Sequence, residues 1–284
     1  MSSYKKYLKK LFEKHNFSPK KFLGQNFLVS RGICKTIVET AEISKRDIVL
    51  EVGPGVGNLT VELAKKAKKV IAIERDKKMI EILKDVLKNA NVRNVKIVQG
   101  DILKLKPKTF DLKIYKLVAN IPYYLTSRLV RKFLEEKIKP RLIVLTVQKE
   151  VAQRICAKPP KMNLLAVSVQ FYASPKITSF ISKKCFWPSP KVDSAIIKIV
   201  LPKSVPLISV GLSLFFKIVR AGFSQPRKQL VNNLSKGLGI EKIKIKRWLL
   251  IEGIKPERRA ESLNIENWIN LAKNYKIIEK CPKH

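Results

Sequence analysis

The chain has 284 residues, 45% of them apolar, and carries 59 lysine and arginine residues against 22 aspartate and glutamate residues. This length and apolar content favour a globular protein with one large domain or two smaller ones. The formal net charge of +37 is far from the near balance of positive and negative charges in an ordinary soluble enzyme. A general enrichment in lysine explains only part of this excess. We therefore expect a nucleic acid partner, bound through its phosphates in a salt-sensitive way.

No apolar run reaches the roughly 18 residues that a membrane-spanning helix needs, and the first ten residues lack the apolar segment of a secretory signal. Basic residues recur along the whole chain rather than on one amphipathic helix, which argues against a membrane partner. We expect a cytoplasmic protein. Neither a zinc site nor a Cys–His nucleophile is predicted, because no metal-ligand spacing exists among Cys34, Cys156, Cys185, Cys281, His15 and His284.

Between residues 48 and 150, short β-branched runs alternate with longer charged segments of helical period, which is typical of parallel βαβ units. The predicted strands are Ile48 to Val52, Val70 to Glu74, Lys96 to Gln99, Leu117 to Asn120 and Leu142 to Val147. The predicted helices between and after them are Leu59 to Lys68, Lys77 to Asn89, Ser127 to Glu136 and Lys149 to Cys156. A terminal hairpin, Ile177 to Ile181 and Ser194 to Val200, completes an open α/β sheet.

After residue 203 the strand signals fade and helical periods take over. Helices are predicted at Leu214 to Gly222, Gln229 to Lys236, Ile243 to Leu250 and Ile265 to Tyr275. We therefore predict three parts: a basic N-terminal arm over residues 1–20, an α/β domain over residues 21–202 and a small helical domain over residues 203–284.

The first strand leads into a glycine-rich turn, Glu-Val-Gly-Pro-Gly-Val-Gly over Glu51 to Gly57. Gly53 and Gly55 lack the Cβ atoms that would keep a ligand from the backbone, and the next helix directs its free N–H groups to the same place. A nucleotide-like ligand could lie there. Glycine turns after strands also arise for steric reasons, so the motif alone leaves both interpretations open.

Two acidic residues end the next two predicted strands. Glu74 could accept hydrogen bonds from both ribose hydroxyls, and Asp101 could bind an adenine amino group while Ile102 packs on the ring. A helix-capping role, which suits Asp76 at least as well as Glu74, and a turn-initiating role for Asp101 are the alternatives. Since the carboxyl ends of parallel strands meet at one edge, these sites would converge on one adenosine, as an NAD enzyme would also require.

A second motif, Asn120-Ile121-Pro122-Tyr123, ends the fourth predicted strand. The side-chain oxygen of Asn120 and the carbonyl of Ile121, which Pro122 helps to hold extended, form two adjacent acceptors for the N–H groups of an exocyclic amine. Accepting both would aim the nitrogen lone pair at a methyl group while Tyr123 stacks on the base. An Asn-x-Pro turn with a core tyrosine is the structural alternative.

With both motifs in place, the chain closely resembles the ribosomal RNA adenine N6-dimethyltransferases of the small ribosomal subunit over nearly its whole length. The other matching stretches are Phe22 to Leu28, Gln148 to Val151, Phe186 to Ser194, Phe223 to Leu234 and Arg258 to Leu263. The loop from Ala157 to Asn163 and the residue Pro226 depart from the family's pattern.

The resemblance implies a Rossmann-like class I S-adenosylmethionine methyltransferase sheet with a small all-helical C-terminal domain that contacts RNA. The implied cofactor residues are Asn26, Leu28, Gly53, Gly55, Glu74, Asp101, Ile102 and Asn120. The implied catalytic residues are Asn120, Ile121, Pro122, Tyr123 and Phe186. In this scheme Asn120 spans cofactor and target amine, and Tyr123 and Phe186 sandwich the flipped-out adenine.

The family's reaction adds two methyl groups to each of two adjacent adenines in a hairpin near the 3′ end of small-subunit rRNA. The implied partner is immature 30S ribosomal subunit, and the implied oligomeric state is a monomer. Two alternatives remain: an adenine methylase of 23S rRNA that confers macrolide resistance, and a non-catalytic RNA-binding assembly or transcription factor of the same fold.

Overall fold

The computed structural model describes residues 3–20, 24–202 and 211–275. The chain forms two compact units, one of Met1–Ala152 with Ala173–Lys203 and one of Gln153–Tyr172 with Ser204–His284. The start of the predicted helical domain at residue 203 lies outside the described residues, as do Phe22, Leu23, Cys281 and His284. No helix among the described residues is long and apolar enough to cross a membrane.

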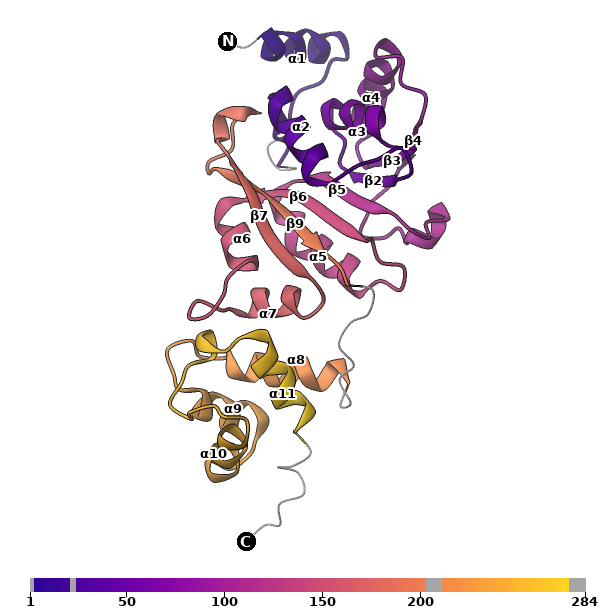
Figure 1. The fold of residues 1–284 in the computed structure, drawn as a ribbon. Helices are drawn as coiled ribbons and strands as arrows, with labels where there is room; N and C mark the ends of the chain where they lie inside the picture. The colour runs from indigo at the N-terminus through magenta and orange to yellow at the C-terminus, as the bar shows by residue number, and fades with distance from the viewer. Residues whose placement is uncertain (1–2, 21–23, 203–210, 276–284) are drawn as a thin grey trace. The chain divides into compact units, whose positions relative to one another are not determined.

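The first unit is built on a seven-stranded sheet in the order β4-β3-β2-β5-β6-β9-β7 (Figure 1). Strands β2 to β6 run parallel, and β9 and β7 add an antiparallel hairpin at one edge. This arrangement confirms the predicted open α/β sheet and its terminal hairpin. The strands are β2 (Ile48–Val52), β3 (Lys69–Glu74), β4 (Val95–Gln99), β5 (Lys116–Asn120), β6 (Leu142–Gln148), β7 (Ser174–Ile181) and β9 (Ser194–Val200).

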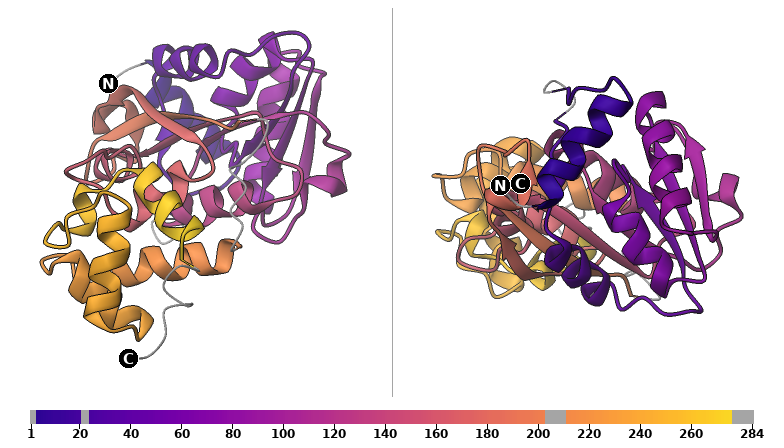
Figure 2. Two further views of the ribbon diagram at one scale, coloured as in Figure 1. Left: turned by 60° about the horizontal axis from the view of Figure 1, so that its bottom comes forward. Right: turned by 90° about the horizontal axis from the view of Figure 1, so that it is seen from above.

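Strands β2, β3, β5 and β6 are buried on both faces, which is why they read as continuous apolar runs, whereas β4 at the edge of the sheet is only partly buried. Helices α2, α3 and α4 lie on one face and α5 on the other (Figures 1 and 2). The helix bounds are α2 (Arg31–Thr40), α3 (Asn58–Lys66), α4 (Lys77–Asn89), α5 (Thr126–Glu135) and α6 (Lys149–Ile155). The chain turns back between β2 and β5, and this reversal of strand order leaves a crevice at the carboxyl ends of the strands.

The segment predicted as a basic arm contains a helix, α1 (Ser3–Lys14), with two unlike faces. Leu8, Leu11 and Phe12 are buried in a cluster with Phe27, while lysines occupy the opposite side. Phe27 belongs to β1 (Phe27–Leu28), which pairs with β8 (Phe186–Trp187) in a two-stranded ribbon. The N-terminal helix thus forms part of the core of the first unit.

The second unit is all-helical, with α7 (Leu164–Gln170), α8 (Leu212–Gly222), α9 (Leu230–Leu238), α10 (Lys242–Ile251) and α11 (Ile265–Lys273). All four predicted C-terminal helices are present within two residues of their expected bounds. The segment from Gln153 to Tyr172 also belongs here, since Phe171 packs on Phe215 with ring centroids 4.5 Å apart. Sequence reasoning had grouped this segment with the sheet.

Candidate active site

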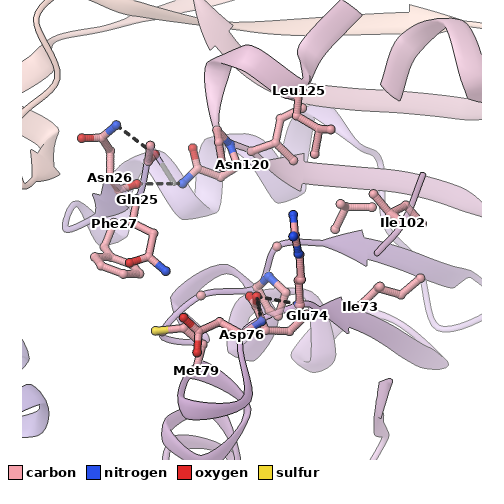
Figure 3. Close-up of a pocket in the computed structure, with 18 of the residues that line it drawn as sticks. Gln25, Asn26, Phe27, Ile73, Glu74, Asp76, Met79, Ile102, Asn120 and Leu125 are labelled. Carbon is pink, nitrogen blue, oxygen red and sulfur yellow. Dashed lines mark hydrogen bonds between the residues drawn. The ribbon is translucent and has the colours of Figure 1, made fainter. Parts of the chain in front are cut away.

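A cavity of about 500 Å³ opens at the crevice between β2 and β5 (Figure 3). It is bordered by the ends of β2, β3 and β5, by the segment before β1, and by the first residue of β8. The structure brings every sequence-predicted site residue to this cavity: Asn26, Leu28, Gly53, Gly55, Glu74, Asp101, Ile102, Asn120, Ile121, Pro122, Tyr123 and Phe186. Residues separated by up to 160 positions therefore share one site.

The sequence left open whether the glycine turn binds a ligand or serves a steric purpose, and the structure shows a different environment at each glycine. Gly53 has a φ of +66°, and a Cβ atom there would approach only the carbonyl oxygen of Asn120, at 4.0 Å, so its pocket side is open. Gly57 has a φ of +85°, and a Cβ atom there would lie 2.7 Å from a methyl carbon of Leu83 on α4. Gly53 thus keeps backbone accessible to a ligand, whereas Gly57 is required by helix packing.

Glu74 is the last residue of β3 and does not cap helix α4. Its Oε1 accepts hydrogen bonds from the backbone amides of Arg75 at 2.7 Å and Asp76 at 2.9 Å. Burial nevertheless raises the pKa of the Glu74 carboxyl above its ordinary value, and these amides offset the rise only in part. The capping role belongs to Asp76, whose Oδ1 accepts from the amide of Lys78 at 3.0 Å.

Asp101 serves the local turn while it lines the cavity. Its Oδ1 accepts a hydrogen bond from the Leu103 amide at 2.9 Å, which is the turn-forming role that the sequence also allowed. Ile102, 5% exposed, adds an apolar wall beside it. The carboxylate has a second oxygen with its own lone pairs, so the turn leaves acceptor capacity for a ligand.

Asn120 joins the two sides of the cavity. Its Nδ2 lies 3.5 Å from the backbone oxygen of Asn26, and no donor among the described residues reaches its Oδ1 (Figure 3). The carbonyl of Ile121 likewise accepts no hydrogen bond from the described part of the chain. Pro122 follows with φ −54° and ψ 135°, an extended geometry that turns the chain away after the two acceptors. Two neighbouring acceptors are therefore unused at the cavity wall.

The two aromatic residues differ in how they meet the cavity. The Tyr123 hydroxyl lies 2.7 Å from Oγ of Ser194, which fixes the half-buried ring, and burial raises the pKa of that phenol. Phe186 is only 4% exposed and belongs to the core beneath α2. Phe186 is thus buried more deeply than a free stacking platform, although it borders the cavity.

Sequence reasoning missed Glu51, the last but one residue of β2. It is 1% exposed and lines the cavity, and its Oε2 has no well-formed hydrogen bond to any described residue, the buried Thr60 hydroxyl being its nearby polar neighbour. Burial raises the pKa of Glu51 to about 8; the Thr60 hydroxyl opposes the rise and the Glu74 charge adds to it. The signal was a lone carboxylate inside an apolar strand, which is costly unless a partner arrives.

A family model described as ribosomal RNA adenine dimethylase matches residues 16–276. The chain is 46% identical to ribosomal RNA small subunit methyltransferase A of Dehalococcoides mccartyi, with 94% of this chain and 92% of that protein covered. It is 40% identical to the protein of the same name from Geobacillus kaustophilus, with 93% of both chains covered.

Solved structures agree with this result. The 23S rRNA methyltransferase ErmE is 26% identical, with a TM-score of 0.73, 88% of this chain covered and 100% of that one. A dimethyladenosine transferase from Plasmodium falciparum is 28% identical, with a TM-score of 0.74 and coverage of 88% and 97%. The fold is that of the class I methyltransferases, and the chain belongs to the ribosomal RNA adenine dimethylase family.

Proposed function

We propose that this protein transfers methyl groups from S-adenosylmethionine to N6 of two adjacent adenines in small-subunit rRNA, giving dimethyladenosine. The observation that carries the proposal is the pair of unused acceptors, Asn120 Oδ1 and the Ile121 carbonyl, at the wall of a cavity that also holds an open glycine turn. An exocyclic amine has two N–H groups that match such a pair.

The cavity fits an adenosine-bearing sulfonium cofactor. Glu74 would accept from the ribose hydroxyls, Asp101 and Ile102 would hold the adenine, and Gly53 would admit the ligand to the backbone. The unpartnered Oε2 of Glu51 suits the ammonium group of a methionine moiety. The group supplies an electrophilic methyl bonded to a cationic sulfur.

The chain's own residues orient the amine and need no strong base. Asn120 Oδ1 and the Ile121 carbonyl oxygen would accept hydrogen bonds from the two N–H groups of the amine. This would draw the nitrogen lone pair out of conjugation with the base and direct it at the methyl. With the cofactor bound in this cavity, its sulfonium would supply the methyl, the amine nitrogen would supply the electron pair, and the amine proton would leave to water. Tyr123, anchored on Ser194, stacks on the base, and Phe186 closes the other side.

Small-subunit rRNA is the favoured substrate over 23S rRNA. The chain is 46% identical to a small subunit methyltransferase A but 26% identical to the 23S enzyme ErmE. We further infer that the substrate is an immature 30S particle and that the protein acts as a monomer in the cytoplasm. The charge of +37 supports binding to a phosphate-rich surface.

The test is incubation of the purified protein with radiolabelled S-adenosylmethionine and immature 30S subunits, followed by nucleoside analysis. We expect label at N6 of adenine in the small-subunit rRNA, and none in naked 23S rRNA. Cofactor binding without any transfer would contradict the proposal and favour a binding-only factor. Transfer to 23S rRNA, together with macrolide resistance on expression, would show that the substrate is 23S rRNA instead.

Asn120→Ala separates transfer from binding. Cofactor affinity should stay within about tenfold, roughly 1.4 kcal/mol, because the Asn120 acceptor acts on the amine. The rate of transfer should fall by at least about 100-fold. Comparable turnover by variant and wild type would remove Asn120 from the mechanism. If the variant, with its adenines unmethylated, fully repairs the assembly defect of a null strain, RNA binding is the primary role.

A further inference from the structure

A second tyrosine lies beside the proposed transfer site and has no role in it. Tyr124 follows Tyr123 in a short 3-10 helix (Tyr123–Leu125), borders the same cavity, and is 58% exposed. The hydroxyl of Tyr124 has no hydrogen-bond partner among the described residues, so no polar contact within the described chain fixes the ring.

The local geometry separates the two rings. Three residues per turn place successive side chains of a 3-10 helix about 120° apart. Tyr123 is held inward by Ser194, and Leu125, next in the turn, lies on the cavity wall (Figure 3). Tyr124 therefore projects at the mouth, where one edge of its ring rests near Gly24: a Cβ atom there would lie 3.7 Å from both Cδ1 and Cε1.

A free cation accompanies this ring. Arg128 on α5 lies four residues after Tyr124, on the same side of the helical segment, and also borders the cavity. It is exposed and forms no hydrogen bond or ion pair with any described residue. By contrast, Arg131 on the same helix is paired with Glu135 at 2.9 Å. An aromatic face and an unpaired guanidinium are thus presented together at the mouth of the cavity.

We propose that Tyr124 and Arg128 form a subsite for the nucleotide next to the target adenine in the RNA chain. When a base is flipped into a pocket, its neighbour loses a stacking partner, and an exposed aromatic ring can replace it. Arg128 would contact the phosphate that joins the two nucleotides. This inference rests on the proposed function, because it presumes an adenine bound between Tyr123 and Phe186.

The test is a double-mutant cycle between protein and RNA. Wild type, Tyr124→Ala and Tyr124→Phe are assayed on 30S subunits reconstituted with intact rRNA or with rRNA abasic at one neighbour of the target. On intact RNA, Tyr124→Ala should lower kcat/KM roughly 5- to 100-fold, the effect of one lost stacking contact. Tyr124→Phe should restore it, since stacking needs no hydroxyl.

On RNA abasic at the contacted side, wild type and Tyr124→Ala should become equal within about twofold, because the stacking partner is already missing. Additive losses at both the 5′ and the 3′ neighbour would overturn the subsite. Equal activity of wild type and Tyr124→Ala on intact RNA would also overturn it. Failure of the wild type to methylate any RNA is a different result, which contradicts the proposed function. Unchanged cofactor affinity of Tyr124→Ala checks that the pocket is intact.

Discussion

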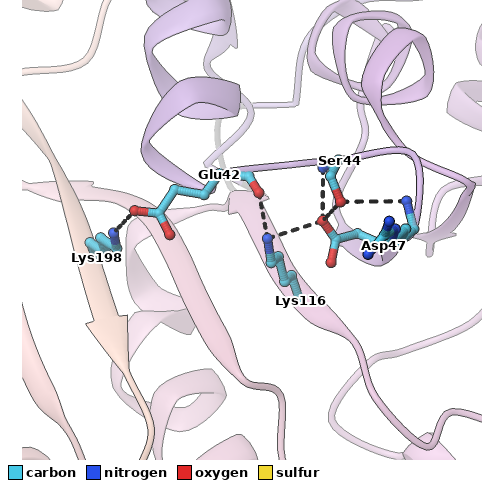
Figure 4. A network of polar contacts seen from close by, with 6 residues as sticks. Glu42, Ser44, Asp47, Lys116 and Lys198 are labelled. Atoms are coloured by element: carbon cyan, nitrogen blue, oxygen red, sulfur yellow. Dashed lines mark hydrogen bonds and ion pairs between the residues drawn. The ribbon is translucent and has the colours of Figure 1, made fainter.

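Charged groups are paired differently at the two ends of the parallel strands, here called the amino edge and the carboxyl edge of the sheet. At the amino ends of the strands, Asp47 accepts hydrogen bonds from Ser44 and from Lys116 Nζ, at 2.7 Å and 3.1 Å, and Lys198 pairs with Glu42 (Figure 4). Burial tends to raise the pKa of Asp47, but these donors outweigh it and leave that pKa below its ordinary value. The Lys198 hydrogen bond lowers the pKa of Glu42 in the same way.

At the carboxyl ends Lys20 pairs with Asp76 at 2.9 Å, but no cation among the described residues pairs with Glu51 or Glu74. Glu51 and Glu74 have raised pKa values, and burial is the main cause for each. Arg128, at the same ends of the strands, has no ion-pair partner in the described part of the chain. The charged groups at the amino ends thus pair with one another and stabilise the fold, whereas two buried carboxyls and one arginine at the carboxyl ends stay unpaired, as a site that must bind a charged ligand requires.

The largest effect that would sharpen this comparison concerns Glu51. Its pKa of about 8 lies above the ordinary 4.5, so the folded protein favours the neutral carboxyl, and ionisation between those values costs stability. Glu51→Gln should therefore match the wild type near pH 4, below the unfolded value of 4.5. It should be more stable by on the order of 3–5 kcal/mol at pH 9. Urea unfolding of the ligand-free proteins at both pH values measures this.

Other groups also titrate in this range, and the difference between the two proteins cancels their contribution. Thr60→Val serves as a control, because it alters the neighbouring hydroxyl without removing the carboxyl. A wild type that loses no more stability than Glu51→Gln between pH 4 and pH 9 would mean that folding does not raise the pKa of Glu51. The proposed difference between the two ends of the strands would then be wrong for Glu51, the carboxyl that shows it most clearly.

The next effect is on cofactor affinity. Glu74→Ala should weaken binding of S-adenosylhomocysteine roughly 10- to 100-fold, because hydrogen bonds to a charged acceptor contribute about 1.5–3 kcal/mol. Isothermal titration calorimetry measures the change. Glu62→Ala is the matched control, since Glu62 on α3 is absent from the cavity wall and pairs with Lys65. Equal losses from the two variants would argue against a ribose contact at Glu74.

A smaller effect compares cations at the two edges. Arg128→Gln should reduce by about 1 the slope of log affinity for small-subunit rRNA against log salt, as expected for one lost phosphate contact. Lys198→Gln should leave the slope unchanged, because Lys198 is already paired with Glu42. Filter binding across a salt series gives both slopes. A change in slope for Lys198 alone would place the RNA on the opposite edge.

The smallest effect concerns Asp47, whose side chain is 23% exposed. Its lowered pKa means that the ionised form stabilises the fold above the unfolded value of 3.8, and that this contribution is lost as pH falls. Asp47→Asn should lower stability by about 1 kcal/mol at pH 7, and the difference from the wild type should shrink as pH falls below 3.8. Thermal unfolding across this range tests it. A constant difference at all pH values would point to packing.

Much of the sheet could be predicted from the sequence because its parallel strands are buried on both faces. β2 and β9 have the predicted bounds, and the helix from Lys77 to Asn89 was predicted to the residue, aided by the Asp76 cap. Burial on both faces leaves continuous β-branched runs, and caps mark helix starts, so both signals are local. The convergence of Glu74, Asp101 and Asn120 followed from their places at the carboxyl ends of predicted parallel strands.

What escaped prediction depends on contacts between distant segments. The pairing of Phe27 with Trp187 joins residues 160 positions apart in a ribbon too short for any strand pattern. The role of Glu51 was missed although its apolar neighbours in the strand signalled burial, because the sequence alone does not show that no partner reaches the carboxyl. Nor could the sequence assign Gly53 to the ligand and Gly57 to Leu83, since the difference lies in what faces each Cα.

The assignment of residues 153–172 to the second unit has a consequence for how this protein is synthesised. Phe171 packs on Phe215, and the Met162 amide bonds the carbonyl of Glu261, a residue made almost one hundred positions later. During translation α7 leaves the ribosome before Phe215 and Glu261 have been synthesised. Its apolar residues therefore cannot pack until those later segments are made. A chain truncated at residue 203 would keep α7 but lack the residues on which it packs. One break in the chain therefore cannot separate the two units, because the second unit contains two separate segments of the sequence.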